Sequence, residues 1–137
     1  MWAIYAVLSA FFAAATSILA KIGIENVDSN LATGIRTVII LLMTCGIVYM
    51  TGTIHQLPQI SQRSWIFLIL SGVATGLSWL FYFKALQMGD ASKVVPVDKF
   101  SVVISMVMAF VFLHEAVTLK VVLGGALITL GTLVLIF

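Results

Sequence analysis

The sequence predicts an all-α integral membrane protein, a bundle of five membrane-spanning helices. Hydrophobic residues make up 62% of the 137 residues and charged residues only 9%, against about 25% charged residues in an average soluble domain. The mean hydropathy is +1.21. Five long apolar runs fill the chain, at residues 2–20, 31–50, 64–86, 94–113 and 119–137. Each is within the range of about 17–25 residues that a helix needs to cross a bilayer.

The connections between these runs are short, so the sequence predicts a single transmembrane domain over residues 1–137 with no soluble domain beside it. The start of the chain lacks the positively charged segment of a secretory signal, and we expect the first run to stay as a helix. Five crossings place the two termini on opposite sides of the membrane. We call the side of the N-terminus side A and the other side B.

Basic residues give no clear orientation. Those of the short loops divide evenly, with Arg63 and Lys120 on side A and Lys21 and Lys93 on side B. The positive-inside rule then gives a tie, unless the basic residues inside the runs near side B are also counted. If those are site residues, the chain can insert both ways. The net charge of +2 is small and dispersed, which argues against nucleic-acid binding.

The first run carries small residues along one face, which favours close packing in the bundle or self-association. The second run begins after a polar segment in which Ser29 or Asn30 can cap the helix. Arg36 lies about a turn and a half inside this run. A guanidinium at that depth either extends to the headgroup region or lines a polar cavity, because it cannot lose its charge.

The third run contains Gly72 and Gly76, a spacing that predicts a tight helix crossing. In the fourth run, Pro96 either opens the helix as its first residue or kinks it and frees carbonyl groups. The fifth run is rich in glycine and predicts a packing or dimer interface. Its candidate interface residues are Gly124, Gly125 and Gly131.

Polar residues gather toward side B, as expected for the vestibule of an alternating-access device; the alternative is that they all lie at the headgroup level. Asp98 and Lys99 point about 100° apart on a helix, so we expect Asp98 to pair with a cation on another helix, Lys84 or Arg36. The excess of positive charge favours an anionic substrate held by Arg36. The expected substrate-binding residues are Arg36, Trp79, Tyr82, Lys84, Asp98 and Lys99, with Trp79 and Tyr82 alternatively serving as interface anchors.

Covalent catalysis and metal binding have no support in the sequence. His55 and His114 belong to separate loops without a cysteine or carboxylate at ligand spacing, and no nucleotide-binding motif is present. The single cysteine, Cys45, is expected to be a small buried hydrophobe. We therefore expect no enzyme, no metal and no cofactor.

Four motifs together resemble the EamA repeat of the drug/metabolite transporter superfamily. They are Phe81-Tyr-Phe-Lys-Ala-Leu86, Gly89-Asp-Ala-Ser-Lys-Val-Val-Pro96, Phe112-Leu-His-Glu115 and Gly124-Gly-Ala-Leu-Ile-Thr-Leu-Gly131. The resemblance covers essentially the whole chain. Two departures are Ala14-Ala15, where many members carry Trp-Gly, and His114, where glycine is common.

The resemblance implies one half of a 5+5 inverted-repeat transporter in the inner or plasma membrane, exporting small organic metabolites such as amino-acid-like anions or zwitterions. The missing half would be an antiparallel second copy or a close paralogue. Residues expected to be structural or gating are Lys21, Gly72, Gly76, Pro96 and Glu115. Alternatives are a non-transporting subunit of a membrane complex and a lipid-linked-sugar flippase subunit. Small multidrug resistance proteins fit less well, because the first run contains no acid.

Overall fold

The computed structural model describes residues 1–137, and its regular elements are all helical. They are α1 (Trp2–Gly23), α2 (Ser29–Met50), the short 3-10 helix η1 (Thr53–Gln59), α3 (Gln62–Met88), α4 (Ala91–Asp98), α5 (Ser101–Phe112) and α6 (Leu119–Ile136). With α4 and α5 taken together, five helical segments are long and apolar enough to cross a membrane. The prediction of an all-helical chain with five spans is confirmed.

The second helix begins earlier than its apolar run. Its N-cap is Asp28, whose carboxylate accepts hydrogen bonds from the backbone N–H groups of Asn30 at 2.9 Å and Leu31 at 3.2 Å. The prediction of Ser29 or Asn30 as the cap was therefore wrong. A carboxylate is a charged acceptor that also complements the positive end of the helix dipole, so it competes well with the neighbouring hydroxyl and amide.

The chain folds as two units, and α1 contributes to both. We call residues Leu19–Gln87 the middle unit; it holds the end of α1, all of α2 and η1, and nearly all of α3. We call Met1–Ile18 together with Met88–Phe137 the terminal unit; it holds the rest of α1 with α4, α5 and α6. Each unit is described by itself.

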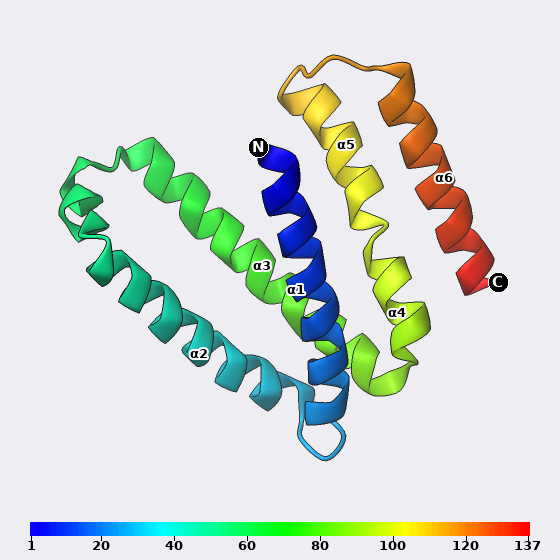
Figure 1. The fold of residues 1–137 in the computed structure, drawn as a ribbon, viewed down its shortest axis with the longest axis horizontal. Helices are drawn as coiled ribbons and strands as arrows, with labels where there is room; N and C mark the ends of the chain where they lie inside the picture. The colour runs from blue at the N-terminus through cyan, green and yellow to red at the C-terminus, as the bar shows by residue number, and fades with distance from the viewer. The chain divides into compact units, whose positions relative to one another are not determined.

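In the middle unit, α2 and α3 form a hairpin that turns through η1 (Figure 1). Buried residues gather where α1 ends, α2 begins and α3 ends. They are Ala20, Ile24, Ser29, Ala32, Thr33, Phe83 and Leu86, and the last two side chains are only 1% and 0% exposed. The remaining length of α2 and α3 exposes its apolar side chains, as expected for surfaces that meet lipid.

In the terminal unit, α6 packs along α4 and α5, beside which it lies in Figure 1. Gly125 is buried in this packing, and a Cβ atom there would lie 3.3 Å from Met106 Sδ. Thr132, two turns further along, is also buried. Gly124 and Gly131 lie on a neighbouring face, where a Cβ atom would meet no other atom within 4 Å.

The fourth span is broken in its middle. Pro96 lies inside α4, which ends at Asp98, and α5 begins only at Ser101. Between them the hydrogen bonds shorten to three-residue steps, with Phe100 N–H donating to Val97 O at 3.0 Å. Proline lacks an N–H group and so removes one helical hydrogen bond. Of the two expected roles of Pro96, the structure has the one inside the helix and not the one that opens it.

Beyond α5, the chain turns at His114, whose φ of 53° is the left-handed conformation. The next residue, Glu115, donates its backbone N–H to the carbonyl of Ala109 at 3.3 Å and so closes the end of α5. Glycine adopts this conformation without strain, whereas a residue with a Cβ atom does not. His114 therefore occupies a position whose backbone favours glycine.

Candidate functional site

A groove in the terminal unit brings the small residues of α1 together with Lys99. Its volume is about 320 Å³, within the range of about 300–1,000 Å³ of small-molecule sites. The α1 side consists of Ala6, Ser9, Ala10, Ala13, Ala14 and Ser17, and the α4 side of Val95 and Lys99. The small side chains leave the room that a larger residue would fill. Ala14, one of the departures from the EamA pattern, is part of this wall.

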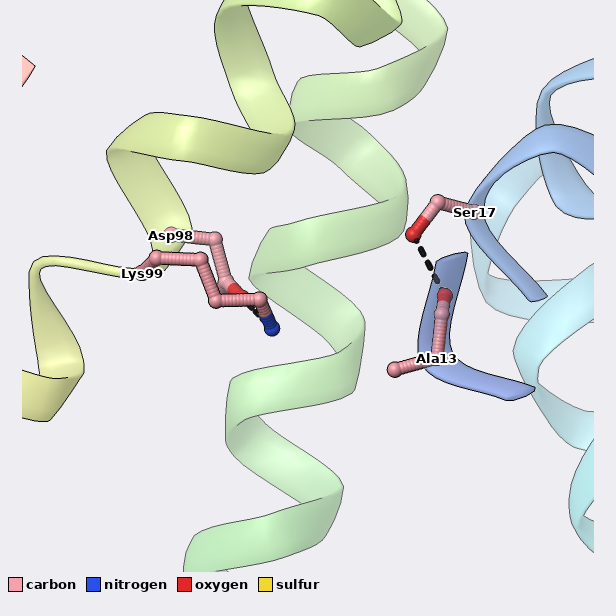
Figure 2. Close-up of polar contacts among 4 residues, drawn as sticks. All are labelled: Ala13, Ser17, Asp98 and Lys99. Carbon is pink, nitrogen blue, oxygen red and sulfur yellow. Dashed lines mark hydrogen bonds and ion pairs between the residues drawn. The ribbon is translucent and has the colours of Figure 1, made fainter. Parts of the chain in front are cut away.

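The groove carries an ion pair at its α4 side. Lys99 Nζ lies 3.4 Å from Asp98 Oδ2, and Figure 2 shows both side chains extending toward the α1 segment that carries Ala13 and Ser17. The Ser17 hydroxyl donates to the carbonyl of Ala13 at 2.9 Å. The exposed fractions of the Lys99 and Asp98 side chains are 53% and 32%. Both charged groups are therefore accessible to a small molecule.

This pairing corrects the expectation that the adjacent side chains of Asp98 and Lys99 would not meet. That expectation assumed a continuous helix, in which neighbouring residues diverge by about 100°. In the structure α4 ends at Asp98, and Lys99 is its C-cap. The long, flexible side chain of Lys99 turns back toward the carboxylate. Its charge there also offsets the unfavourable position of an acid at the C-terminal end of a helix.

The groove lies deep in the predicted membrane span. The span that includes α4 and α5 runs from Ala91 to Phe112, so Lys99 is about 12 Å along it from its start at 1.5 Å per residue. That depth argues against a headgroup position for this residue. In many transporters, substrates bind near the bilayer midplane, where a discontinuous helix presents polar groups. The broken fourth span provides such a discontinuity.

Lys21, in the middle unit, has a different environment. Its ammonium donates to the carbonyl of Leu86 at 2.6 Å, a group in the last turn of α3, where helical carbonyls lack helical partners. Gln87 donates from Nε2 to the carbonyl of Val27 at 3.0 Å. These two bonds join the end of α3 to α1 and to the α1–α2 connection. A hollow of about 430 Å³ is lined by Lys21, Ile22, Ile24, Glu25 and Gln87.

Arg36 stacks on an aromatic ring that the sequence did not single out. Its Cζ atom lies 4.4 Å from the centroid of the Phe83 ring, within the range of a cation–π contact. The Tyr82 ring meets the Phe83 ring edge-on, with 5.5 Å between centroids. Phe83 shares a face of α3 with Leu86 and Trp79, at helical spacing. The spacing of these residues predicts that they share one helical face, but it does not predict that Arg36 contacts this face.

The other predicted residues have varied positions. Trp79 and Tyr82 are half-buried, whereas Lys84 is exposed. A Cβ atom at Gly72 or Gly76 would meet no other atom within 4 Å, so these glycines support no close packing inside the middle unit. The structure contains no group of three or more His, Cys, Asp or Glu residues arranged to hold a metal.

These features define a class: a multi-pass membrane protein with a groove between the helices of its terminal unit, lined by small residues and one charged residue, Lys99. Comparison with known proteins gives the family. The whole chain, residues 1–137, matches the EamA-like transporter family, and the chain belongs to that family. A relative from a Sinorhizobium species, described as an uncharacterized transporter in the cobO 3' region, is 47% identical over 134 residues. The match covers 98% of this chain and 95% of the relative. No solved structure matches the chain significantly.

Proposed function

We propose that this protein is a secondary transporter that exports small organic anions or zwitterions, such as amino-acid-like metabolites, across the inner or plasma membrane. The observation that carries the proposal is the mid-span groove in which Lys99, paired with Asp98, faces the small residues of α1. Charged side chains at membrane depth are costly even when paired, and they commonly mark a substrate or ion pathway. Membership of the EamA-like transporter family supports the same function.

The chemistry of the groove fits the proposed substrates. Lys99 offers a positive charge to a carboxylate, and Asp98 offers a negative charge to an ammonium group. A bound zwitterion would replace this ion pair by two new ones, its carboxylate with Lys99 and its ammonium group with Asp98. The alanines of α1 then contact its apolar part. Arg36, Trp79, Tyr82 and Lys84 lie in the middle unit, and their role in substrate binding stays a prediction.

The working unit in this proposal is an antiparallel dimer with a second copy or a close paralogue. The 47%-identical relative is matched over 95% of its own length, so another chain of single-repeat length is described as a transporter. With an odd number of spans, an inverted second copy supplies the opposite topology that alternating access uses. The open face at Gly124 and Gly131 is a candidate contact surface.

Transport by point variants tests the function. In inverted vesicles incubated with a panel of labelled amino acids and hydroxy acids, Asp98→Ala and Arg36→Ala should lose the uptake that the unaltered protein shows. Lys120→Ala is the control, because Lys120 is a basic residue at the start of α6 and outside the groove. If both variants transport as well as the control, the cavity assignment fails and a non-transporting subunit becomes the better reading.

Reporter fusions test the dimer. A C-terminal alkaline phosphatase reports one side of the membrane and a green fluorescent protein reports the other. Dual topology predicts that both fusions are active in the same cells. A single uniform orientation would rule out the antiparallel homodimer and leave a paralogous partner.

A further inference from the structure

The guanidinium of Arg36 has an aromatic ring against one face, and its N–H groups point away from that ring. The Phe83 ring covers that face at 4.4 Å. The guanidinium also interacts electrostatically with Tyr82, and no hydrogen bond fixes its N–H groups. The five N–H groups of arginine lie in its plane and point outward from its edges. They are therefore the part of the side chain that the Phe83 contact leaves available.

We infer that Arg36 binds a carboxylate edge-on, in two parallel hydrogen bonds, and that Phe83 is the residue that positions it. The inference rests on the proposed function and deepens it, since it adds a carboxylate-binding group in the middle unit that is distinct from the Lys99 of the terminal unit. Bidentate pairing requires the guanidinium to be coplanar with the carboxylate. A ring fixed against one face sets that plane before the ligand arrives.

Phe83 is suited to this role because it is itself immobile. Its side chain is 1% exposed, next to the fully buried Leu86. The edge of Tyr82 packs against it. A platform held by packing reduces the conformational freedom that Arg36 loses when a ligand binds. Lys21, by contrast, already donates to the Leu86 carbonyl and serves the fold.

Charge favours a carboxylate over a phosphate. Arg36 is about 10 Å inside the second span, counted from Ser29 at 1.5 Å per residue, and a charge with unfilled donors at that depth is costly. One guanidinium balances one negative charge. A carboxylate brings one, whereas a phosphate monoester brings about two at neutral pH.

The test is selective arginine labelling. The purified protein, in an uncharged maltoside detergent, is treated with phenylglyoxal, and modification of Arg36 and Arg63 is followed by peptide mass spectrometry. Arg63 is a matched internal control: its Cζ lies 5.9 Å from the Phe67 ring, at the exposed start of α3. The probes are benzoate, its neutral isostere benzamide, inorganic phosphate and phosphatidylglycerol, all at one ionic strength set with sodium chloride.

Benzoate at about four times its dissociation constant should slow labelling of Arg36 roughly fivefold, since protection grows as one plus the ratio of ligand to dissociation constant. Labelling of Arg63 should not change, and benzamide should protect neither. Equal protection of both arginines, or protection by benzamide, overturns the inference. Stronger protection by phosphate or by phosphatidylglycerol than by benzoate also overturns it, in favour of a phosphate or lipid-headgroup site.

Phe83 variants test the positioning role. Phe83→Leu should abolish the protection by benzoate in the folded fraction, whereas Phe83→Tyr, which keeps the ring, should retain it. Phe81→Leu is the matched control, because Phe81 is 74% exposed. If Phe83→Leu lowers the melting temperature but leaves protection intact, Phe83 is only a core residue. Because labelling reports binding alone, a failure here is distinct from a failure of transport.

Discussion

The two units hold their charged side chains in different ways. In the middle unit, Lys21 donates to a carbonyl at the end of α3, and Arg36 stacks on a buried ring. In the terminal unit, Lys99 pairs only loosely with its neighbour Asp98, at 3.4 Å, and it lines a groove. Lys21 therefore joins helix ends in the middle unit, whereas Lys99 remains accessible in the terminal unit.

The difference follows from where each unit buries its side chains. The middle unit has a small, tightly buried cluster around Phe83 and Leu86, which fixes the ends of three helices. The terminal unit buries little beyond Gly125 and Thr132 on α6 and Ser17 on α1. A groove needs space that side chains leave unfilled, whereas a contact that joins helix ends needs closely packed side chains. The terminal unit has the groove and the middle unit has the closely packed contact.

The largest expected effect is the loss of the Phe83 ring. Phe83→Ala should reduce the free energy of unfolding by about 3–5 kcal/mol, because it leaves a cavity in the middle unit. Phe81→Ala, two residues earlier and exposed, should change it little. Thermal unfolding in detergent, followed by tryptophan fluorescence, measures both. Similar losses for the two variants would mean that the buried cluster does not hold the middle unit together.

The next effect separates two lysines. Lys99→Met should reduce transport at least about tenfold, the equivalent of 1.4 kcal/mol, with little change in melting temperature. Lys21→Met should do the reverse: it removes a charged hydrogen bond to Leu86 and should cost about 1.5–3 kcal/mol of stability. Transport rates, normalised to folded protein, and melting curves measure the two. If both variants changed transport and melting temperature in the same way, the proposed difference between the two lysines would be wrong.

A pair of neighbouring glycines tests packing in the terminal unit. Gly125→Leu should destabilise the protein by about 1–3 kcal/mol, because the new side chain meets Met106 in the α5–α6 contact. Gly124→Leu points into open space and should leave the unit stable. If Gly124 is part of the dimer contact, its variant should instead shift the protein toward monomer in cross-linking. A stable Gly125→Leu protein would show that α6 packs elsewhere.

The smallest effect is a gain. His114→Gly should raise the free energy of unfolding by up to about 1 kcal/mol, because glycine adopts the left-handed backbone at this position without a Cβ clash. His55→Gly, in η1, is the control and should not stabilise. Melting curves measure both variants. An unchanged or lower melting temperature for His114→Gly would mean that its side chain compensates for the backbone strain.

Much of the fold could be read from the sequence because membrane spans are set by length and hydropathy. The helix break and the ion pair of the fourth span were harder to predict. Pro96 signalled a disturbance in the fourth span, but the choice between opening and interrupting the helix depends on where the helix begins, which apolar runs do not show. The Asp98–Lys99 pair was missed for the same reason, since it forms at the point where α4 ends.

The candidate groove could be predicted only in part. The small-residue face of the first helix was visible, and so was Lys99 as a charged residue in a span. Their meeting depends on tertiary packing, which has no local signature. Phe83 was one of three aromatic residues in four positions of α3, and only the three-dimensional arrangement distinguishes the ring that faces Arg36 from the one that is exposed.

The continuity of α1 has a mechanical consequence. This helix passes from one unit to the other at Ile18 and Leu19 without interruption, so a single continuous helix belongs to both units. The direction of α1 in one unit is therefore tied to its direction in the other unless the helix bends. Ser17, one residue from the crossing, bonds back to the carbonyl of Ala13, a contact that often bends helices. We therefore expect α1 to bend most readily beside Ser17, next to the point where it passes from one unit to the other.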